Sequence, residues 1–283
     1  MKDISVITVT HDSVNYIENL ILSVVTGAKI ASVEHFVVDN GSSDGTAERV
    51  EEHYSNYITF IKNRDNLGFG AANNLAFSLA QGRFLLFLNP DMRVEEGSLD
   101  RLIAWLDVHP EAGIVSCRPV DAEGKTLWHR GPRAFPKWYL NLWWLIWPSL
   151  ITGRTQVEDG DPQVVDVVLG AFMLVRREML ERLGFAFDPR YFLTFEDADL
   201  CREAKRLGYQ VVYYPAISCI DFNSRSFAKK EPLWIYRQVS RGMLTYFRKW
   251  SPWYVWIWLS ACIPLGYAIR FVIIKFKSSL KGV

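Results

Sequence analysis

The stretch "RFLLFLNPDMRV", Arg83 to Val94, decides the fold prediction. Five apolar residues, Phe84 to Leu88, run directly into Asn89, Pro90 and Asp91. A strand that is apolar on both faces is typical of the middle of a parallel sheet covered by helices. Open α/β sheets bind ligands at the C-terminal ends of such strands, and Pro90 stiffens the turn there. We therefore expect Asp91 to face a ligand-binding cleft.

The residues on either side of this stretch alternate between strand and helix patterns. The predicted strands are 4–10, 34–40, 58–63 and 84–88, and the predicted helices are 13–25, 47–54, 70–81 and 98–109. Gly82 is the expected C-terminal cap of the third helix. This alternation predicts a parallel, doubly wound sheet.

The second half of the chain is less regular. We expect a strand and hairpin at 113–128, strand residues from 164 that lead into a short helix ending at Gly184, a helix at 195–208, and a strand at 209–215 that ends at Pro215. Residues 128–163 show little periodicity.

Composition excludes several classes of protein. The chain has 283 residues, which suits one large domain or a domain with an appendage. Its 32 Lys and Arg nearly balance its 31 Asp and Glu, so nucleic acid is not expected as a partner. The four cysteines have no metal-ligand spacing, which favours a reducing compartment. The N-terminal residues predict a first strand and not a signal peptide.

Nine of the eleven tryptophans fall in two segments, which indicates two membrane-facing patches. They are Trp138, Trp143, Trp144 and Trp147 in the first segment, and Trp234, Trp250, Trp253, Trp256 and Trp258 in the second. An aromatic-rich core or an oligomer interface is the alternative. The apolar run Trp138–Ile151 is short for a membrane span, and Trp253–Ile269 is at the lower margin of the required length. Basic residues flank the second run, which fits either a crossing or a helix lying on an anionic membrane surface.

Three groups of acidic residues are candidates for a site. Asp39 and Asp91 each follow a predicted strand, so a parallel sheet would bring them to one edge. Asp39 is suited to accept hydrogen bonds from a nucleobase or ribose, and Asp91 to bind Mg²⁺ or Mn²⁺ on a diphosphate. The third group, "FEDAD" at 195–199, could supply a general base, because crowded carboxylates raise each other's proton affinity. The structural alternatives are a turn cap for Asp39, a helix N-cap for Asp91, and an acidic helix start for the third group.

The segment "NLGFGAANN", Asn66 to Asn74, places two glycines before a helix start, where backbone N–H groups favour phosphate. It lacks the third glycine of a dinucleotide-binding loop, so a simple tight turn is the alternative.

Six motifs in order carry a resemblance to a known family. They are "ISVITVTHDS", "FVVDNGSSDGT", "NLGFGAANN", "FLLFLNPD", "VLGAFMLVRREML" and "FDPRYFLTFEDADLCREAKRLGY". Together they resemble the inverting family-2 glycosyltransferases of GT-A fold, in the rhamnosyltransferase-like branch that carries Asn-Pro-Asp. The resemblance covers roughly residues 3–226. It implies an α/β, Rossmann-like GT-A domain at 1–226, whose mostly parallel central sheet is flanked by helices. Residues 227–283 would then form a hydrophobic, membrane-associated helical segment.

The resemblance also implies roles for individual residues. The nucleotide-sugar donor would contact Thr10, Asp39, Gly68, Asn74, Asn89 and Asp91. Asp91 would hold the metal, Asp197 would be the catalytic base with Glu196 as its neighbour, and Gly170 and Ala171 would border the acceptor. Relatives carry a metal-ligating His where counting from Pro215 gives Asp221, so Asp221 is the second expected metal ligand.

The function implied by the resemblance is metal-dependent, inverting sugar transfer from a nucleoside-diphosphate sugar, with dTDP-rhamnose as the donor that the branch indicates. The acceptor would be a polyprenyl-diphosphate-linked or other glycan in bacterial cell-surface polysaccharide biosynthesis. The enzyme would lie at the cytoplasmic face of the cell membrane, peripheral or anchored by a single segment. Two alternatives remain: a non-catalytic nucleotide-sugar-binding relative, and a sugar-1-phosphate nucleotidyltransferase, whose glycine- and arginine-rich loop is missing after the first strand.

Overall fold

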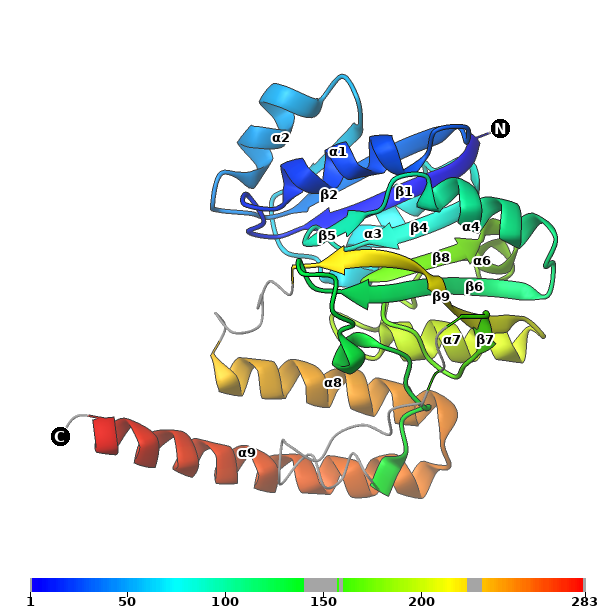
Figure 1. The fold of residues 1–283 in the computed structure, drawn as a ribbon. Coiled ribbons are helices and arrows are strands. Elements are labelled where there is room, and N and C mark those ends of the chain that lie inside the picture. The colour runs from blue at the N-terminus through cyan, green and yellow to red at the C-terminus, as the bar shows by residue number, and fades with distance from the viewer. Residues whose placement is uncertain (1, 140–156, 158–159, 223–230, 282–283) are drawn as a thin grey trace.

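A central β-sheet with helices on both faces forms the body of the protein (Figure 1). The computed structural model describes residues 2–139, 157, 160–222 and 231–281. The strands are β1 (Lys2–Thr10), β2 (Val33–Asn40), β3 (Thr59–Asn63), β4 (Gly82–Leu88), β5 (Met92–Val94), β6 (Ala112–Val120), β7 (Gln163–Val164), β8 (Phe172–Arg176) and β9 (Gln210–Asp221). The helices are α1 (Ile17–Gly27), α2 (Thr46–Tyr54), α3 (Phe69–Phe77), α4 (Ser98–Asp107), the 3₁₀ turn η1 (Trp128–Arg130), α6 (Arg177–Leu183), α7 (Glu196–Arg206), α8 (Pro232–Trp250) and α9 (Trp253–Lys281).

The strand order is β3-β2-β1-β4-β8-β6-β9-β5, with β7 paired to β9. The first four strands in this order are parallel, as the alternating pattern predicts. β8 is antiparallel to both β4 and β6, while β6 and β9 are parallel to each other. The expected α/β fold with a helix-flanked central sheet is therefore confirmed, with the antiparallel pairs confined to its second half.

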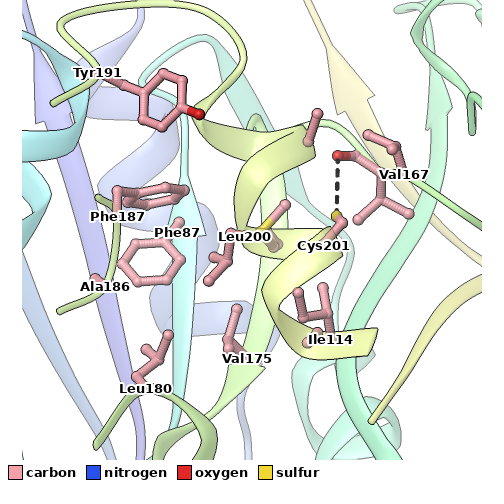
Figure 2. Packing of buried hydrophobic residues seen from close by; sticks show 14 of the residues in the cluster. Phe87, Ile114, Val167, Val175, Leu180, Ala186, Phe187, Tyr191, Leu200 and Cys201 are labelled. Carbon is pink, nitrogen blue, oxygen red and sulfur yellow. Dashed lines mark hydrogen bonds between the residues drawn. The ribbon is translucent and has the colours of Figure 1, made fainter. Parts of the chain in front are cut away.

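β4 lies between two hydrophobic cores, which explains its apolar sequence. Phe84, Leu86 and Leu88 face the core on one side of the sheet, and Leu85 and Phe87 face the core on the other. Full burial of each such side chain contributes about 1.5–3 kcal/mol. Figure 2 shows the second core, in which the ring of Phe87 packs edge-on against Phe187 with a centroid separation of 4.7 Å.

Two of the expected element boundaries are wrong. α3 ends at Phe77, and Gly82 is not its cap but the first residue of β4. An added Cβ at Gly82 would overlap the backbone of Ile4 and Ser5, so this glycine permits the close approach of β4 to β1.

The second wrong boundary is the end of the last strand. β9 continues through Pro215 as far as Asp221. The register with β6 jumps from Tyr214 to Ser218, so the proline sits in an irregularity where its missing N–H disrupts no ladder bond. The end of the helix before Gly184 is confirmed, since this glycine has the left-handed φ of +79° typical of a helix cap.

α8 and α9 form an antiparallel pair beneath the sheet domain, with α8 between α7 and α9 (Figure 1). α8 contributes Tyr236, Met243, Tyr246 and Phe247 to the same core as Phe87. The stretch Trp253–Lys275 of α9 is long and apolar enough to cross a membrane.

Replacing Gly82 by Ala should destabilise the fold by about 1–3 kcal/mol, because the new methyl group must displace the backbone of β1. Urea denaturation would measure this free energy of unfolding. Gly27→Ala is the matched control: its Cβ would meet only side-chain carbons at 3.4 Å, so its stability should equal or exceed wild type. Equal stability of the two variants would contradict the packing described for β4.

Candidate active site at the carboxyl edge of the sheet

Asp39, at the C-terminal end of β2, is buried and held by two hydrogen bonds. The hydroxyl of Thr10, at the end of β1, donates to Oδ1 at 3.1 Å, and the backbone N–H of Ser42 donates to Oδ2 at 3.1 Å. The Ser42 bond is the turn cap considered from the sequence. The paired strand ends therefore fix the orientation of this carboxylate at the sheet edge.

The side chain of Asn40 organises the loop before α3. Its Nδ2 donates to Asn66 Oδ1 at 3.0 Å and to the carbonyl of Gly68 at 3.3 Å, and its Oδ1 accepts from the N–H of Leu67 at 2.9 Å. Gly68 has a φ of +85°, and a Cβ there would overlap the carbonyl oxygen of Phe192. The loop is thus clamped between the end of β2 and the segment that leads into α7.

Asn74 has a different environment from the one expected of a donor-contacting residue. Its Nδ2 donates to the carbonyl of Phe187 at 2.7 Å, and its Oδ1 accepts from the N–H groups of Ala186 and Phe187 at 2.9 and 3.0 Å. Both ends of the amide therefore hold the backbone that precedes α7. These contacts give Asn74 a structural role, and its expected place in the segment that lines the nucleotide-sugar pocket stays a prediction.

Asn89 and Asp91 form the turn between β4 and β5. The N–H of Asn89 donates to the carbonyl of Ala171 at 2.9 Å, and the carbonyl of Asn89 accepts from Met92 at 3.2 Å. Asp91 is buried, and the N–H of Phe222 donates to its backbone carbonyl at 3.0 Å. A strand follows Asp91, so the helix N-cap alternative is wrong.

Asp221 lies next to this turn, because β5 and β9 pair with Met92 opposite Asp221. Its carboxylate accepts a hydrogen bond from Arg130 Nε at 2.6 Å. Burial lowers the pKa of Arg130, but the hydrogen bond and charge of Asp221, together with the charge of Asp91, raise it above its usual value. A small pocket beside this cluster is lined by Arg130, Asp221, Leu169 and Ala171, among others.

Glu196 and Asp197 begin α7, where the acidic motif was expected. Asp197 accepts from Arg133 Nη2 at 2.8 Å and from the N–H of Ala198 at 2.7 Å. Burial, together with the negative charge of Asp197, raises the pKa of Glu196 to about 8. Its Oε2 is buried without a hydrogen-bond partner among the described residues. At neutral pH the pair therefore consists of a protonated Glu196 and an ion-paired Asp197.

The segment 169–171 connects these two acidic clusters. Ala171 accepts the hydrogen bond from Asn89 and lines the pocket with Arg130 and Asp221. Gly170 lies against the other cluster: a Cβ at this position would be 3.6 Å from the Cβ of Asp197. The turn Asn89–Asp91 and Asp197, which are far apart in sequence, thus both lie against the segment 169–171, and Asp39 lies at the same edge two strands from β4.

The sequence profile of the family described as glycosyl transferase family 2 matches residues 5–184, which is more than half of the chain. The chain belongs to glycosyl transferase family 2. The matched region contains β1 to β8, including the strand ends that carry Asp39 and Asp91. α7, with Glu196 and Asp197, lies beyond it.

Curated relatives include an N-acetylglucosaminyl-diphospho-decaprenol L-rhamnosyltransferase from Mycobacterium tuberculosis. It is 26% identical over 241 residues, which cover 78% of this chain and 76% of the relative. The O-antigen biosynthesis protein RfbC from Myxococcus xanthus is 28% identical over 218 residues, covering 74% of this chain but only 16% of that protein.

Solved structures share the fold. The crystal structure of S. aureus TarS residues 1–349 in complex with UDP aligns with a TM-score of 0.55 and 20% identity, covering 87% of this chain and 65% of that chain. The structure of GalNAc-T7 with UDP, GalNAc and Mn²⁺ aligns with a TM-score of 0.60 and 15% identity, covering 78% of this chain and 44% of that chain. These likenesses confirm the expected GT-A fold.

The turn that carries Asp91 could supply part of the ligand set of a divalent cation. Carboxylate oxygens suit Mg²⁺ and Mn²⁺, which commonly bind through one or two protein carboxylates together with substrate phosphates and water. Within the described residues, no group of three or more His, Cys, Asp or Glu side chains has metal-binding geometry. Asp91 would hold the ion, whereas Asp221 already neutralises Arg130.

Sequence reasoning missed Arg130 and Arg133, which pair with Asp221 and Asp197. Both arginines lie in the region 128–163 that shows no periodicity, so no pattern assigned them to an element. Two arginines in "WHRGPR", in a loop that enters the site from β6, are the signal that could have found them.

The raised pKa of Glu196 predicts a pH-dependent stability. Because the folded protein holds this proton up to a pH of about 8 and the unfolded chain releases it near its ordinary value of 4.5, wild-type stability should fall as pH rises between these values. Glu196→Gln cannot ionise, so it should be more stable than wild type at pH 8 by more than about 1 kcal/mol. Chemical denaturation at pH 5 and pH 8 would measure this difference, with Glu52→Gln on the exposed face of α2 as control. A pH-independent difference between Glu196→Gln and wild type would contradict the buried, protonated carboxyl.

Proposed function

We propose that this chain is an inverting glycosyltransferase that moves a sugar from a nucleoside-diphosphate donor to a glycan acceptor. The observation that carries the proposal is that the turn Asn89–Asp91 and Asp197 both lie against the segment 169–171, at the edge of the sheet that also presents Asp39. In open α/β sheets this edge is the ligand-binding edge. A donor lying along it would extend from Asp39 past Asp91 toward Asp197.

The donor half of the site combines hydrogen-bond acceptors with positive charge. Asp39, oriented by Thr10, would accept hydrogen bonds from the base or ribose, and the loop at Gly68 would border the donor. Asn89 and Asp91 would lie at the diphosphate, beside the ion pair of Arg130 with Asp221. When bound, Mg²⁺ or Mn²⁺ at Asp91 would neutralise charge on the leaving diphosphate.

Asp197 would act as the general base. It would take the proton from an acceptor hydroxyl as that oxygen attacks the anomeric carbon, while the bond to the diphosphate breaks on the opposite face. A single displacement of this kind inverts the anomeric centre. Arg133, bonded to Asp197 Oδ2 at 2.8 Å, would orient the carboxylate. Glu196, protonated at neutral pH, would keep a second negative charge out of the site.

The named activity of the mycobacterial relative supports a polyprenyl-diphosphate-linked acceptor, a rhamnose donor and a role in bacterial cell-surface polysaccharide biosynthesis. The apolar, aromatic stretch 138–151 would suit such an acceptor. The structure describes Trp138 and Tyr139 of this stretch, both exposed, and 140–151 lie outside the described residues. A lipid-linked acceptor requires the enzyme at a membrane surface, and cytoplasmic sugar nucleotides would put it at the cytoplasmic face. Within residues 227–283, expected from the sequence to be membrane-associated, we propose α9 as the membrane-associated part, because α8 packs into the core of the sheet domain.

The roles of the two acidic residues can be separated by binding and by transfer. Asp91→Asn should remove the Mn²⁺-dependent thermal stabilisation by a nucleotide sugar, because the metal ligand is lost. Asp197→Asn should retain that stabilisation but lose transfer by at least about 100-fold, because the base is lost. A thermal-shift panel of nucleotide sugars, followed by transfer to a polyprenyl-diphosphate glycan, would measure both.

Exposed Asp161, changed to Asn, is the control for both measurements. Normal transfer by Asp197→Asn would remove that residue from the role of base. Donor binding by the wild type without transfer or hydrolysis would instead favour the non-catalytic alternative.

The exposed side chains of α9 give a test of membrane attachment. Trp253 and Trp258 are 68% and 66% exposed. Replacing both by Ser should weaken binding to anionic phospholipid vesicles by at least about ten-fold, because aromatic area leaves the interface. The control replaces Leu22 and Val25, equally apolar and exposed on α1, by Ser. Sedimentation with vesicles would measure binding, and equal loss in both double variants would contradict a membrane-binding role for α9.

A further inference from the structure

The turn that leads into α7 has an unfavourable backbone conformation. Thr194 and Phe195 both have a φ of +68°, in the left-handed region that non-glycine residues rarely adopt. For a β-branched residue such as Thr194 this conformation is a true outlier. Such a conformation persists only where the surrounding structure imposes it, and here it directly precedes Glu196 and Asp197.

α8 supplies a contact that imposes this conformation. Gly242 faces the turn so closely that a Cβ there would lie 2.5 Å from the carbonyl oxygen of Thr194 and 3.1 Å from that of Leu193. Any side chain at position 242 would push the turn away. The Thr194 hydroxyl has no hydrogen-bond partner among the described residues, so helix packing and not a side-chain bond holds this residue.

The C-terminal end of α8 makes further contacts, with α7 itself. Lys249 Nζ lies 2.7 Å from Asp199 Oδ2 and 2.8 Å from a carboxylate oxygen of Glu203. The indole N–H of Trp250 donates to Asp199 Oδ1 at 2.6 Å. Asp199 is buried on α7, two residues after Asp197, so these contacts fix the first turn of α7 from the side of α8.

We propose that Gly242, Lys249 and Trp250 are positioning residues that hold Asp197 in place for proton transfer. This inference rests on the proposed function. α8 then belongs to the catalytic unit, although it lies beyond residues 5–184 matched by the family profile and beyond the expected domain boundary at 226. α8, which α9 follows directly in the chain, would therefore also fix the position of Asp197.

Gly242→Ala tests the proposal, with Arg241→Ala on the exposed side of α8 as the matched control. The glycine variant should lower kcat for transfer by at least about ten-fold while the donor KM stays within about two-fold, because misplacement of a catalytic group affects the chemical step and not donor binding. Hydrogen exchange should become faster in peptides covering 190–206 and stay unchanged in β1 and β2. Arg241→Ala should match the wild type in all three measurements.

A second variant keeps the test decisive if Gly242→Ala does not fold. Trp250→Phe keeps an aromatic, though smaller, ring and removes the N–H donor to Asp199, and it should give the same pattern with a smaller loss of kcat. Unchanged kcat and unchanged exchange at 190–206 in a folded Gly242→Ala would overturn the inference, as would equal losses in kcat and donor affinity. Faster exchange at 190–206 together with a wild type that transfers no sugar would leave the α8 contact standing and contradict the proposed function instead.

Discussion

The hydrogen bond from the N–H of Asn89 to the carbonyl of Ala171, at 2.9 Å, is the link on which the site depends. It continues the antiparallel pairing of β4 with β8 beyond Leu88 and Phe172. Without this pairing, the turn that carries Asp91 and the segment beside Asp197 would have no fixed positions relative to each other. β8, as an antiparallel strand inserted next to the parallel ones, therefore joins the turn that carries Asp91 to the segment beside Asp197.

Much of this arrangement could be predicted because parallel strands reveal themselves by buried apolar runs. The run Phe84–Leu88 and Asp39 at the C-terminal end of β2 identify the sheet edge from local pattern alone. Gly82 was misassigned because a glycine after a helical pattern is usually a cap, and only the tertiary packing against Ser5 shows its real role. The predicted end of this last strand at Pro215 is wrong for a similar reason, since the irregularity that accommodates the proline exists only in the pairing of β9 with β6.

The charge partners of the acidic residues could not be predicted. Arg130 and Arg133 reach Asp221 and Asp197 across 91 and 64 positions of sequence, from a segment without periodicity. Asn74 shows the converse problem. The sequence suggests that it lines the nucleotide-sugar pocket, whereas its amide holds the backbone at 186–187. The hydrophobic pattern of a sequence locates its helices and strands. The partner of a polar side chain depends instead on which loops meet at the edge of the sheet.

A crystal structure with a nucleoside diphosphate and Mn²⁺ is the most direct measurement of the central claim, that Asp39, Asp91 and Asp197 line one pocket. We expect the nucleobase to lie at Asp39, and the diphosphate and metal at Asp91. The carboxylate of Asp197 should face the terminal phosphate of the diphosphate across Gly170. A nucleotide bound elsewhere, or packed side chains separating the diphosphate from Asp197, would contradict the account.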